Sequence, residues 1–346
     1  MNASRSAHDV ELCRKLIARA DEMRHQDPAR ALELARSGRN LAAGLDRARL
    51  GDAGWHGLQA EAWGVLASVL RAVSKLDEAE GALNVAIAFA GGVAATSRDD
   101  PTLAPRLAQR AAYLRASQQR YDEALELIEE AVTAFRELRA PAQLATCLVD
   151  RSVILADAGW KPQALIVLQR TLRRYRARMA PRTFLAAVHN IAVFLHDLAR
   201  SRPAMQEAIA WLRFAIRCHE RYPETLGLLK LYALHGLTAI RLGEIGPGVA
   251  SLWAAHGGFK RLGARRQQAI NLLDLAAVAL QHERRRDLRR VGGEMFPVLR
   301  AFDHDPEARQ ALVRFCRALV DGTLTTRLIR RVATALRAGE PIYFGG

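Results

Sequence analysis

Apolar residues recur along most of the chain at spacings of three and four, which is the period of an amphipathic helix. No stretch alternates convincingly between apolar and polar residues, as a half-buried strand would. Proline precedes nine of the apolar runs, and proline is tolerated in the first helical turn, where its missing N–H would have no partner. Asp27-Pro28 and Asp305-Pro306 add a capping carboxylate. The pattern predicts a chain of short helices.

These helix starts divide the chain into eight antiparallel helix pairs. We expect the pairs at 8–25/28–44, 52–73/76–90, 102–118/121–138, 141–158/161–178, 181–199/204–220, 224–242/246–261, 264–282/285–302 and 306–320/324–338. Predicted helix ends carry Gly91-Gly92, Gly159, Gly243 and Gly263. Residues 91–100 form the longest expected loop, and Pro297 predicts a kink or an early helix end. Because no long linker appears, we expect a single helical-repeat domain over 1–346, with capping helices and a tail in 303–346.

A small residue recurs in the second helix of successive pairs. The aligned positions are Ala31, Ala79, Ala124, Ala164, Ala208 and Ala250. A small residue where two helices cross lets their backbones approach, and a larger residue four positions later fills the adjoining hole. The recurrence therefore predicts similar hairpins stacked side by side.

The strongest unit runs from Trp63 through Leu66, Ala67 and Leu70 and continues with Ala79, Leu83 and Ala86. This order of large and small residues resembles the tetratricopeptide repeat family, and the resemblance covers about 28–300. The period here is longer than the usual ~34 residues, as in bacterial regulators with extended repeats. The resemblance implies an all-α, right-handed α-solenoid of about eight antiparallel helix pairs. Its concave groove, lined by the first helix of each pair, would bind a peptide or a partner protein.

Carried over position by position, the resemblance places a set of polar side chains in that groove. The set is Gln109, Arg110, Tyr113, Asp150, His189, Asn190, His196, His235 and Asp274. An Asn side chain both donates and accepts hydrogen bonds, which suits an extended peptide backbone. Asn190 is therefore the first choice as a binding residue, although each of these side chains could equally satisfy neighbouring repeats or water.

Cofactor, metal and catalytic signals are absent from the sequence. The four cysteines, at 13, 147, 218 and 316, lie far apart and form no CxxC pair, so neither a disulfide scaffold nor a zinc ribbon is expected. His189 and His196 share a helix face but lie two turns, ~10 Å, apart, too far to chelate one ion. Nucleophile-elbow, zinc-protease, P-loop and dinucleotide motifs are missing. We therefore expect no cofactor and no enzyme activity, although an active site assembled from distant helices leaves no obligatory spacing.

The termini and hydropathy predict a cytoplasmic chain. Met1 to Val10 has no apolar core, so it is not expected to be a signal peptide. No segment reaches the ~18 uninterrupted apolar residues of a membrane-spanning helix.

The net charge of +15 comes from two stretches, 151–182 and 258–346, which sum to +7 and +8. The predicted basic patch comprises Arg170, Arg173, Arg174, Arg178, Arg284, Arg285, Arg286, Arg289 and Arg290. Such clusters attract phosphate, but few aromatic residues lie nearby for base stacking. The sequence therefore predicts a non-enzymatic protein-interaction scaffold or regulatory module, whose protein or peptide partner can be acidic. The alternative is a nucleic-acid-binding helical-repeat protein that uses the clusters at 170–182 and 284–290.

Overall fold

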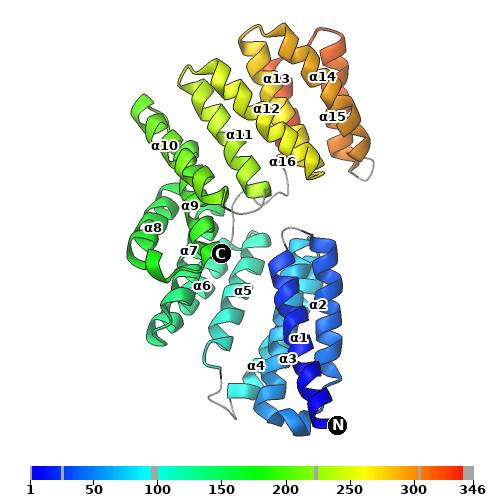
Figure 1. Ribbon diagram of the computed structural model, residues 1–346, viewed down its shortest axis with the longest axis vertical. Helices are drawn as coiled ribbons and strands as arrows, with labels where there is room; N and C mark the ends of the chain where they lie inside the picture. The colour runs from blue at the N-terminus through cyan, green and yellow to red at the C-terminus, as the bar shows by residue number, and fades with distance from the viewer. Residues whose placement is uncertain (1, 25–26, 95–99, 222–224, 303–304, 338–346) are drawn as a thin grey trace. The chain divides into compact units, whose positions relative to one another are not determined.

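The computed structural model describes residues 2–24, 27–94, 100–221, 225–302 and 305–337. Within these ranges the backbone forms sixteen α-helices, two 3₁₀ turns and no strand. The helices are α1 (Asn2–Met23), α2 (Pro28–Ala43), α3 (Arg47–Ala72), α4 (Leu76–Ala94), α5 (Leu103–Ser117), α6 (Tyr121–Glu137), α7 (Pro141–Asp157), α8 (Lys161–Tyr175), α9 (Pro181–Leu198), α10 (Arg202–His219), α11 (Leu226–Arg241), α12 (Ile245–Arg261), α13 (Arg265–Gln281), α14 (Arg285–Leu299), α15 (Pro306–Val320) and α16 (Thr326–Arg337). Figure 1 shows them as consecutive hairpins.

The sixteen helices confirm the predicted all-α solenoid of eight pairs. The chain divides into two compact units, Met1–Ala180 with α1–α8 and Pro181–Gly345 with α9–α16. We call them unit 1 and unit 2. Inside each unit a second helix packs against its own first helix and against the first helix of the next pair. The expectation of one continuous repeat domain stays a prediction.

The helix crossings are built on small residues, as the alanine pattern predicts. Ala31, Ala79, Ala124, Ala164 and Ala208 are completely buried. Ala250 is exposed, so the prediction for the sixth pair is wrong. There the crossing is at Gly248: a Cβ atom at this position would lie 2.7 Å from the carbonyl oxygen of Gly236. The two glycines let the backbones of α11 and α12 touch, which the alanines elsewhere do not allow.

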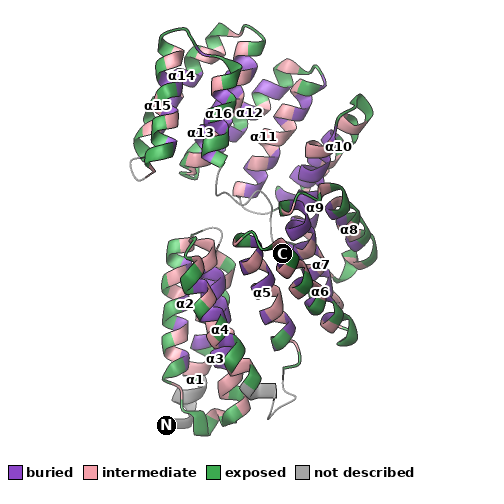
Figure 2. Ribbon diagram, turned by 180° about the vertical axis from the view of Figure 1, so that it is seen from behind, coloured by how far each residue is buried: buried purple, intermediate pink, exposed green. Residues whose placement is uncertain are grey.

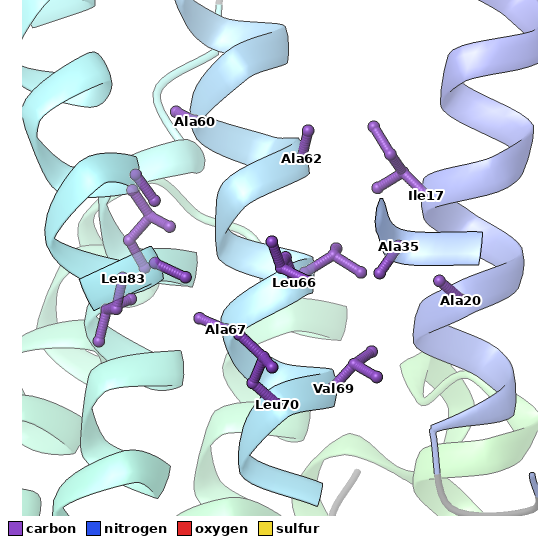
Figure 3. Close-up of a cluster of buried hydrophobic side chains, with 14 of the residues drawn as sticks. Ile17, Ala20, Ala35, Ala60, Ala62, Leu66, Ala67, Val69, Leu70 and Leu83 are labelled. Carbon is purple, nitrogen blue, oxygen red and sulfur yellow. The ribbon is translucent and has the colours of Figure 1, made fainter. Parts of the chain in front are cut away.

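The core of unit 1 joins neighbouring hairpins through the first helix of the second pair. Figure 3 shows Leu66 and Val69 pointing from α3 toward Ala20 and Ala35 of the first pair, while Leu83 faces α3 from α4. These apolar side chains are almost fully buried. A single pair cannot cover both faces of α3, so the stacking of hairpins supplies the core.

Three of the four predicted glycine signals lie at helix ends. Gly159, Gly243 and Gly263 adopt the left-handed conformation at helix ends. Gly91-Gly92 does not end a helix, because α4 continues to Ala94, and residues 95–99 of the expected loop lie outside the described residues. Helix α14 continues past Pro297 to Leu299 and then tightens into a 3₁₀ turn. Along the described chain, no helix combines the length and hydrophobicity needed to cross a membrane.

Candidate functional site

A pocket of about 230 Å³ lies among the first helices of unit 1. Four first helices contribute to it, α1, α3, α5 and α7, together with one side chain of α6. The lining residues are Asp21, Arg24, Ser68, Arg71, Arg106, Gln109, Arg110, Tyr113, Phe135, Gln143, Thr146 and Asp150. First helices face the same side of the stack, so polar residues on their common face gather in one place. This pocket is the candidate site.

Asp150 forms one wall of the pocket and is held by two donors from α5. The Tyr113 hydroxyl donates to Oδ1 of Asp150 at 2.5 Å, and the Gln109 amide donates to Oδ2. Only 1% of Asp150 is exposed, so these bonds replace the water that the carboxylate has lost. Burial and the neighbouring Asp150 raise the pKa of Tyr113 well above its ordinary value. Tyr113 therefore keeps its proton and acts as a donor.

Arg110 and Asp21 form the opposite wall. The Arg110 guanidinium donates to Ser68 Oγ at 2.7 Å and lies 3.4 Å from Asp21 Oδ1. Arg24 approaches the same carboxylate oxygen at 2.7 Å. Burial acts to raise the pKa of Asp21, but Arg110 and Arg24 hold it well below its usual range. Asp21 is therefore ionised and already shared between two cations.

Arg110 reaches this position because α3 carries a glycine opposite it. A Cβ atom on Gly64 would lie 2.8 Å from Leu107 Cδ2 of α5, and the Gly64 carbonyl accepts a hydrogen bond from Arg110 at 3.3 Å. The missing side chain therefore lets α5 approach α3 closely enough to bring the guanidinium into the pocket.

Arg71 has no carboxylate partner. Its guanidinium lies over the Tyr113 ring, 5.1 Å from the centroid, and donates one long hydrogen bond of 3.4 Å to Ser117 Oγ. No carboxylate of the described chain lies within ion-pair distance of it. Burial lowers the pKa of Arg71 and repulsion from Arg24 lowers it further, whereas Tyr113, Asp150 and Asp21 act in the opposite direction. An arginine stays protonated even so, and the pocket therefore contains a cation whose nearest carboxylates act on it from beyond ion-pair distance.

The charges of the lining residues do not balance. Four arginines face two aspartates. Arg106 is neutralised from outside the lining by Asp100 at 2.6 Å and Glu61 at 3.4 Å. Arg71 is therefore the lining arginine without a direct ion pair, and Asp150 and Asp21 act on it only at longer range.

The pocket brings together four of the nine predicted groove residues, Gln109, Arg110, Tyr113 and Asp150. Asp21, Arg24, Ser68 and Arg71 are not among the predicted groove residues, because the predicted positions begin at the third pair. The sequence does carry one indication of Arg71: this arginine directly follows the run 65–70 of α3, whose side chains are all buried.

In unit 2, two predicted groove residues are buried instead. His189 is 1% exposed and Asn190 is 0% exposed, and neither lines the pocket of unit 1, so partner binding by these two residues stays a prediction. The His189 ring contacts the His219 ring of α10 edge to face, with 5.6 Å between centroids. Burial lowers the pKa of His189 well below its ordinary value. This part of the face serves packing within the pair rather than contact with solvent.

The other three predicted residues of unit 2 bridge neighbouring helices. His196 Nδ1 lies 2.7 Å from Thr238 Oγ1 of α11, and burial lowers the pKa of His196 to about 4. His235 Nδ1 lies 3.4 Å from Ser251 Oγ of α12. Asp274 pairs with Arg337 of the terminal helix α16 at 3.3 Å, yet burial raises its pKa to about 6. No described pocket unites these three residues.

The predicted basic patch lies in two parts, one in each unit. Arg170, Arg173, Arg174 and Arg178 are exposed on α8 and the 3₁₀ turn that follows it. Arg284, which directly precedes α14, pairs with Asp287, and Arg290 of α14 lies 3.7 Å from the centroid of the Trp253 ring. The exposed arginines of this cluster also include Arg285, Arg286 and Arg289.

Metal ligands and reactive thiols do not gather in the part of the chain that the structure covers. No group of three or more His, Cys, Asp or Glu residues is placed to hold a metal ion among the described residues. Cys13 and Cys316 are buried, and burial raises the pKa of both to about 11. These thiols are protonated at neutral pH and so are weak nucleophiles.

No family model and no curated protein matches the sequence. Solved structures do match. The Rap protein complexed with competence and sporulation factor is 13% identical, with a TM-score of 0.59 over 95% of this chain and 85% of that one. NprR in complex with its cognate peptide NprX is 13% identical, with a TM-score of 0.54 over 92% and 88%.

A signal-transduction ATPase from Pyrococcus horikoshii with a tetratricopeptide repeat sensor is 10% identical, with a TM-score of 0.59 over 88% of this chain and 48% of that one. At these identities the likeness concerns the backbone, and it agrees with the repeat pattern of Trp63 to Ala86. The chain therefore has the helical-repeat fold of tetratricopeptide-repeat proteins.

Proposed function

We propose that the chain is a non-enzymatic recognition module that binds an acidic segment of a peptide or partner protein in the pocket of unit 1. The observation that carries this proposal is Arg71, a pocket arginine with no carboxylate within ion-pair distance in the described chain. Arg71 is half-buried, and a cation that has lost part of its water without gaining an ion-pair partner is stabilised by an incoming carboxylate. The ligand would therefore complete an electrostatic arrangement that the protein leaves incomplete.

The hydrogen-bonding capacity of Arg71 supports an anionic ligand. A guanidinium has five donors in a planar fork that matches a carboxylate, and Arg71 uses one of them in a long bond. The Tyr113 ring beneath the guanidinium limits its movement, which lowers the entropic cost of binding. Asp150 is occupied by Tyr113 and Gln109, so its charge is partly satisfied before any ligand arrives.

The structural matches support a peptide as the class of ligand. Two of them are complexes, Rap with competence and sporulation factor and NprR with its cognate peptide NprX. A concave face lined by first helices offers a peptide side-chain pockets along an extended path. The pocket of unit 1 is lined mainly by residues of first helices, which supports this mode of binding.

The chemistry of the pocket favours recognition over catalysis. Tyr113 holds its proton, Asp21 is shared between two arginines, and Asp150 is bound by two donors. A general base or nucleophile needs a pKa close to the working pH or an activating neighbour. The positions of these side chains suit the binding of a charged ligand rather than proton transfer or nucleophilic attack.

Peptide display tests the proposal. A random peptide library selected on the full-length chain should enrich sequences with an Asp, a Glu or a free terminal carboxylate. The variant Arg71→Gln should lose these peptides, because an amide cannot pair with a carboxylate as a guanidinium does.

Arg136→Gln serves as the matched control, because Arg136 is exposed on α6 and does not line the pocket. It should retain the same peptides. Enrichment of peptides without any acidic group, or equal recovery on Arg71→Gln and on the wild type, would contradict the proposal.

A further inference from the structure

Two charged stripes lie on the outer helices of unit 1. The acidic stripe on α6 consists of Asp122, Glu126, Glu130 and Glu137. The basic stripe on α8 and the 3₁₀ turn after it consists of Arg170, Arg173, Arg174 and Arg178. All eight side chains are exposed, and Figure 2 shows green residues along both helices. None of them lines the pocket.

The stripes are not neutralised within the chain. None of the eight residues forms an ion pair with any other residue that the structure describes. Other acids of α6 do find partners: Glu123 pairs with Arg120 at 2.6 Å, and Glu129 pairs with Arg151 at 3.1 Å. The acidic stripe is therefore the part of α6 that the protein leaves without counter-charge.

The repeat places the two stripes on the same side of unit 1. Ala124 and Ala164 are equivalent positions of α6 and α8, both are fully buried, and both helices pack against α7. Counting from these alanines, Glu130 is equivalent to Arg170, and Glu126 is equivalent to the exposed Ile166. Equivalent positions of stacked repeats point in the same direction. The outer surface of unit 1 thus carries an acidic band on α6 and a basic band on α8, and α7 packs against both helices.

The presence of an acidic stripe on the same side as the basic stripe argues against a nucleic acid as the partner that binds α8. A phosphate chain attracted by the basic stripe would be repelled by the four uncompensated carboxylates of α6, the equivalent helix of the preceding pair. A complementary surface must carry both signs side by side in the opposite order. We propose that the partner of this surface is a second copy of this chain, which carries those two bands.

Symmetry selects one arrangement for the pair. A two-fold axis that runs parallel to α6 and α8 and between them turns the second copy over, so that each acidic stripe faces the partner's basic stripe. A two-fold axis across the helices would set each stripe against its own equivalent, with like charges opposed. In the first arrangement Glu130 meets the partner's Arg170, and the same contact occurs twice, as in any isologous interface.

Several contacts must act together in this interface. A single exposed ion pair contributes about 0–1 kcal/mol. Each copy supplies four acids and four arginines, and Ile166, 47% exposed, adds apolar area at the same level as Glu126. Because the charges lie at the surface, salt should weaken the association.

Charge reversal tests the inference on the full-length chain. One variant carries Glu130→Lys and Glu137→Lys, and the other carries Arg170→Glu and Arg174→Glu. Sedimentation velocity should show a concentration-dependent dimer for the wild type that dissociates at high salt. Each reversed variant should have a dimer dissociation constant raised about tenfold or more, because like charges then face each other twice.

The control Arg285→Glu with Arg289→Glu reverses two exposed arginines at the same four-residue spacing on α14 and should dimerise as the wild type does. Mixing the two reversed variants should restore a heterodimer, since each reversed acid then faces a reversed base.

A wild type that stays monomeric, reversed variants that dimerise normally, or a mixture that stays monomeric would each overturn the proposal. Circular dichroism of each variant separates lost association from lost folding.

Discussion

At the residue scale, the same helical register leads to different outcomes because burial depends on the neighbours. Asp150 and Asn190 occupy equivalent positions of α7 and α9, and both were predicted to face the groove. Both side chains are almost fully buried, but Asp150 lines the pocket of unit 1, whereas Asn190 is enclosed by packed side chains of unit 2. A sequence shows which face of a helix a side chain occupies, but it does not show how closely the next helix approaches. That distance depends on the summed volumes of many side chains.

Close backbone contact makes the crossing of α11 and α12 sensitive to one methyl group. In Gly248→Ala the new Cβ would lie 2.5 Å from Ile240 Cγ1 and 2.7 Å from the Gly236 carbonyl oxygen. We expect the free energy of unfolding to fall by about 1–3 kcal/mol in denaturant titrations. Gly246→Ala, with no atom near its Cβ, is the control and should be neutral or slightly stabilising. Equal stability of the two variants would show that the crossing is loose.

The buried His196 predicts acid sensitivity of unit 2. Its pKa is lowered to about 4 by burial, so the unfolded chain binds a proton on this histidine between about pH 6.5 and 4 and the folded chain does not. Stability is therefore complete above about pH 6.5 and falls as the pH decreases, by about 2 kcal/mol at pH 5 from this residue.

The variant His196→Asn keeps a donor near Thr238 but does not titrate. Between pH 7 and pH 5 it should lose less unfolding free energy than the wild type, measured by urea titration at both values. Asp274 acts in the opposite direction, because its pKa is raised to about 6. The comparison of the two chains removes that contribution. Parallel losses in both chains would contradict the assignment.

At the scale of elements, the helices were predictable because proline, capping and periodicity agree. Helix α7 begins at Pro141 and ends at Asp157, against a prediction of 141–158. The extension of α4 to Ala94 was not predictable from Gly91-Gly92, since glycine permits a helix end without requiring one. The pocket was predicted in part: four of its α5 and α7 residues are among the predicted groove positions, whereas those positions begin at the third pair and include no residue of α1 or α3.

The terminal helix α16 closes unit 2 and should contribute strongly to its stability. Its buried residues are Ile329, Val332, Ala333 and Leu336, and it packs against α13 and α15. Leu336→Ala should cost about 2–5 kcal/mol of unfolding free energy through the cavity it leaves. The exposed Arg330→Ala should change it by less than about 0.5 kcal/mol. A small effect of Leu336→Ala would mean that α16 is not part of the cooperative unit.

At the scale of the whole molecule, the position of each charged side chain matters more than the net charge. The chain carries a net charge of +15, yet the pocket, the outer surface of unit 1 and α14 use arginine in three different ways. Charge counting along the sequence located the outer clusters. It did not reveal Arg71, because only the folded chain shows which carboxylates are absent around it.

Because unit 1 is compact, we predict that it can fold by itself. The fragment 1–180 contains α1–α8 and every residue of the pocket. We expect it to be helical by circular dichroism and to unfold in one cooperative transition, since repeats are stabilised mainly by their nearest neighbours. A fragment without a cooperative transition would show that unit 1 depends on the rest of the chain.

The most direct test of the account is a double-mutant cycle between Arg71 and the acidic group of a selected peptide. Calorimetry would measure four affinities of the full-length chain: wild type and Arg71→Gln, each with the acidic peptide and with its amide analogue. We predict that either change alone weakens binding about tenfold and that the second change then adds little, because both remove one interaction. Independent and additive effects, or an unchanged affinity in Arg71→Gln, would contradict the claim that this arginine binds the anion.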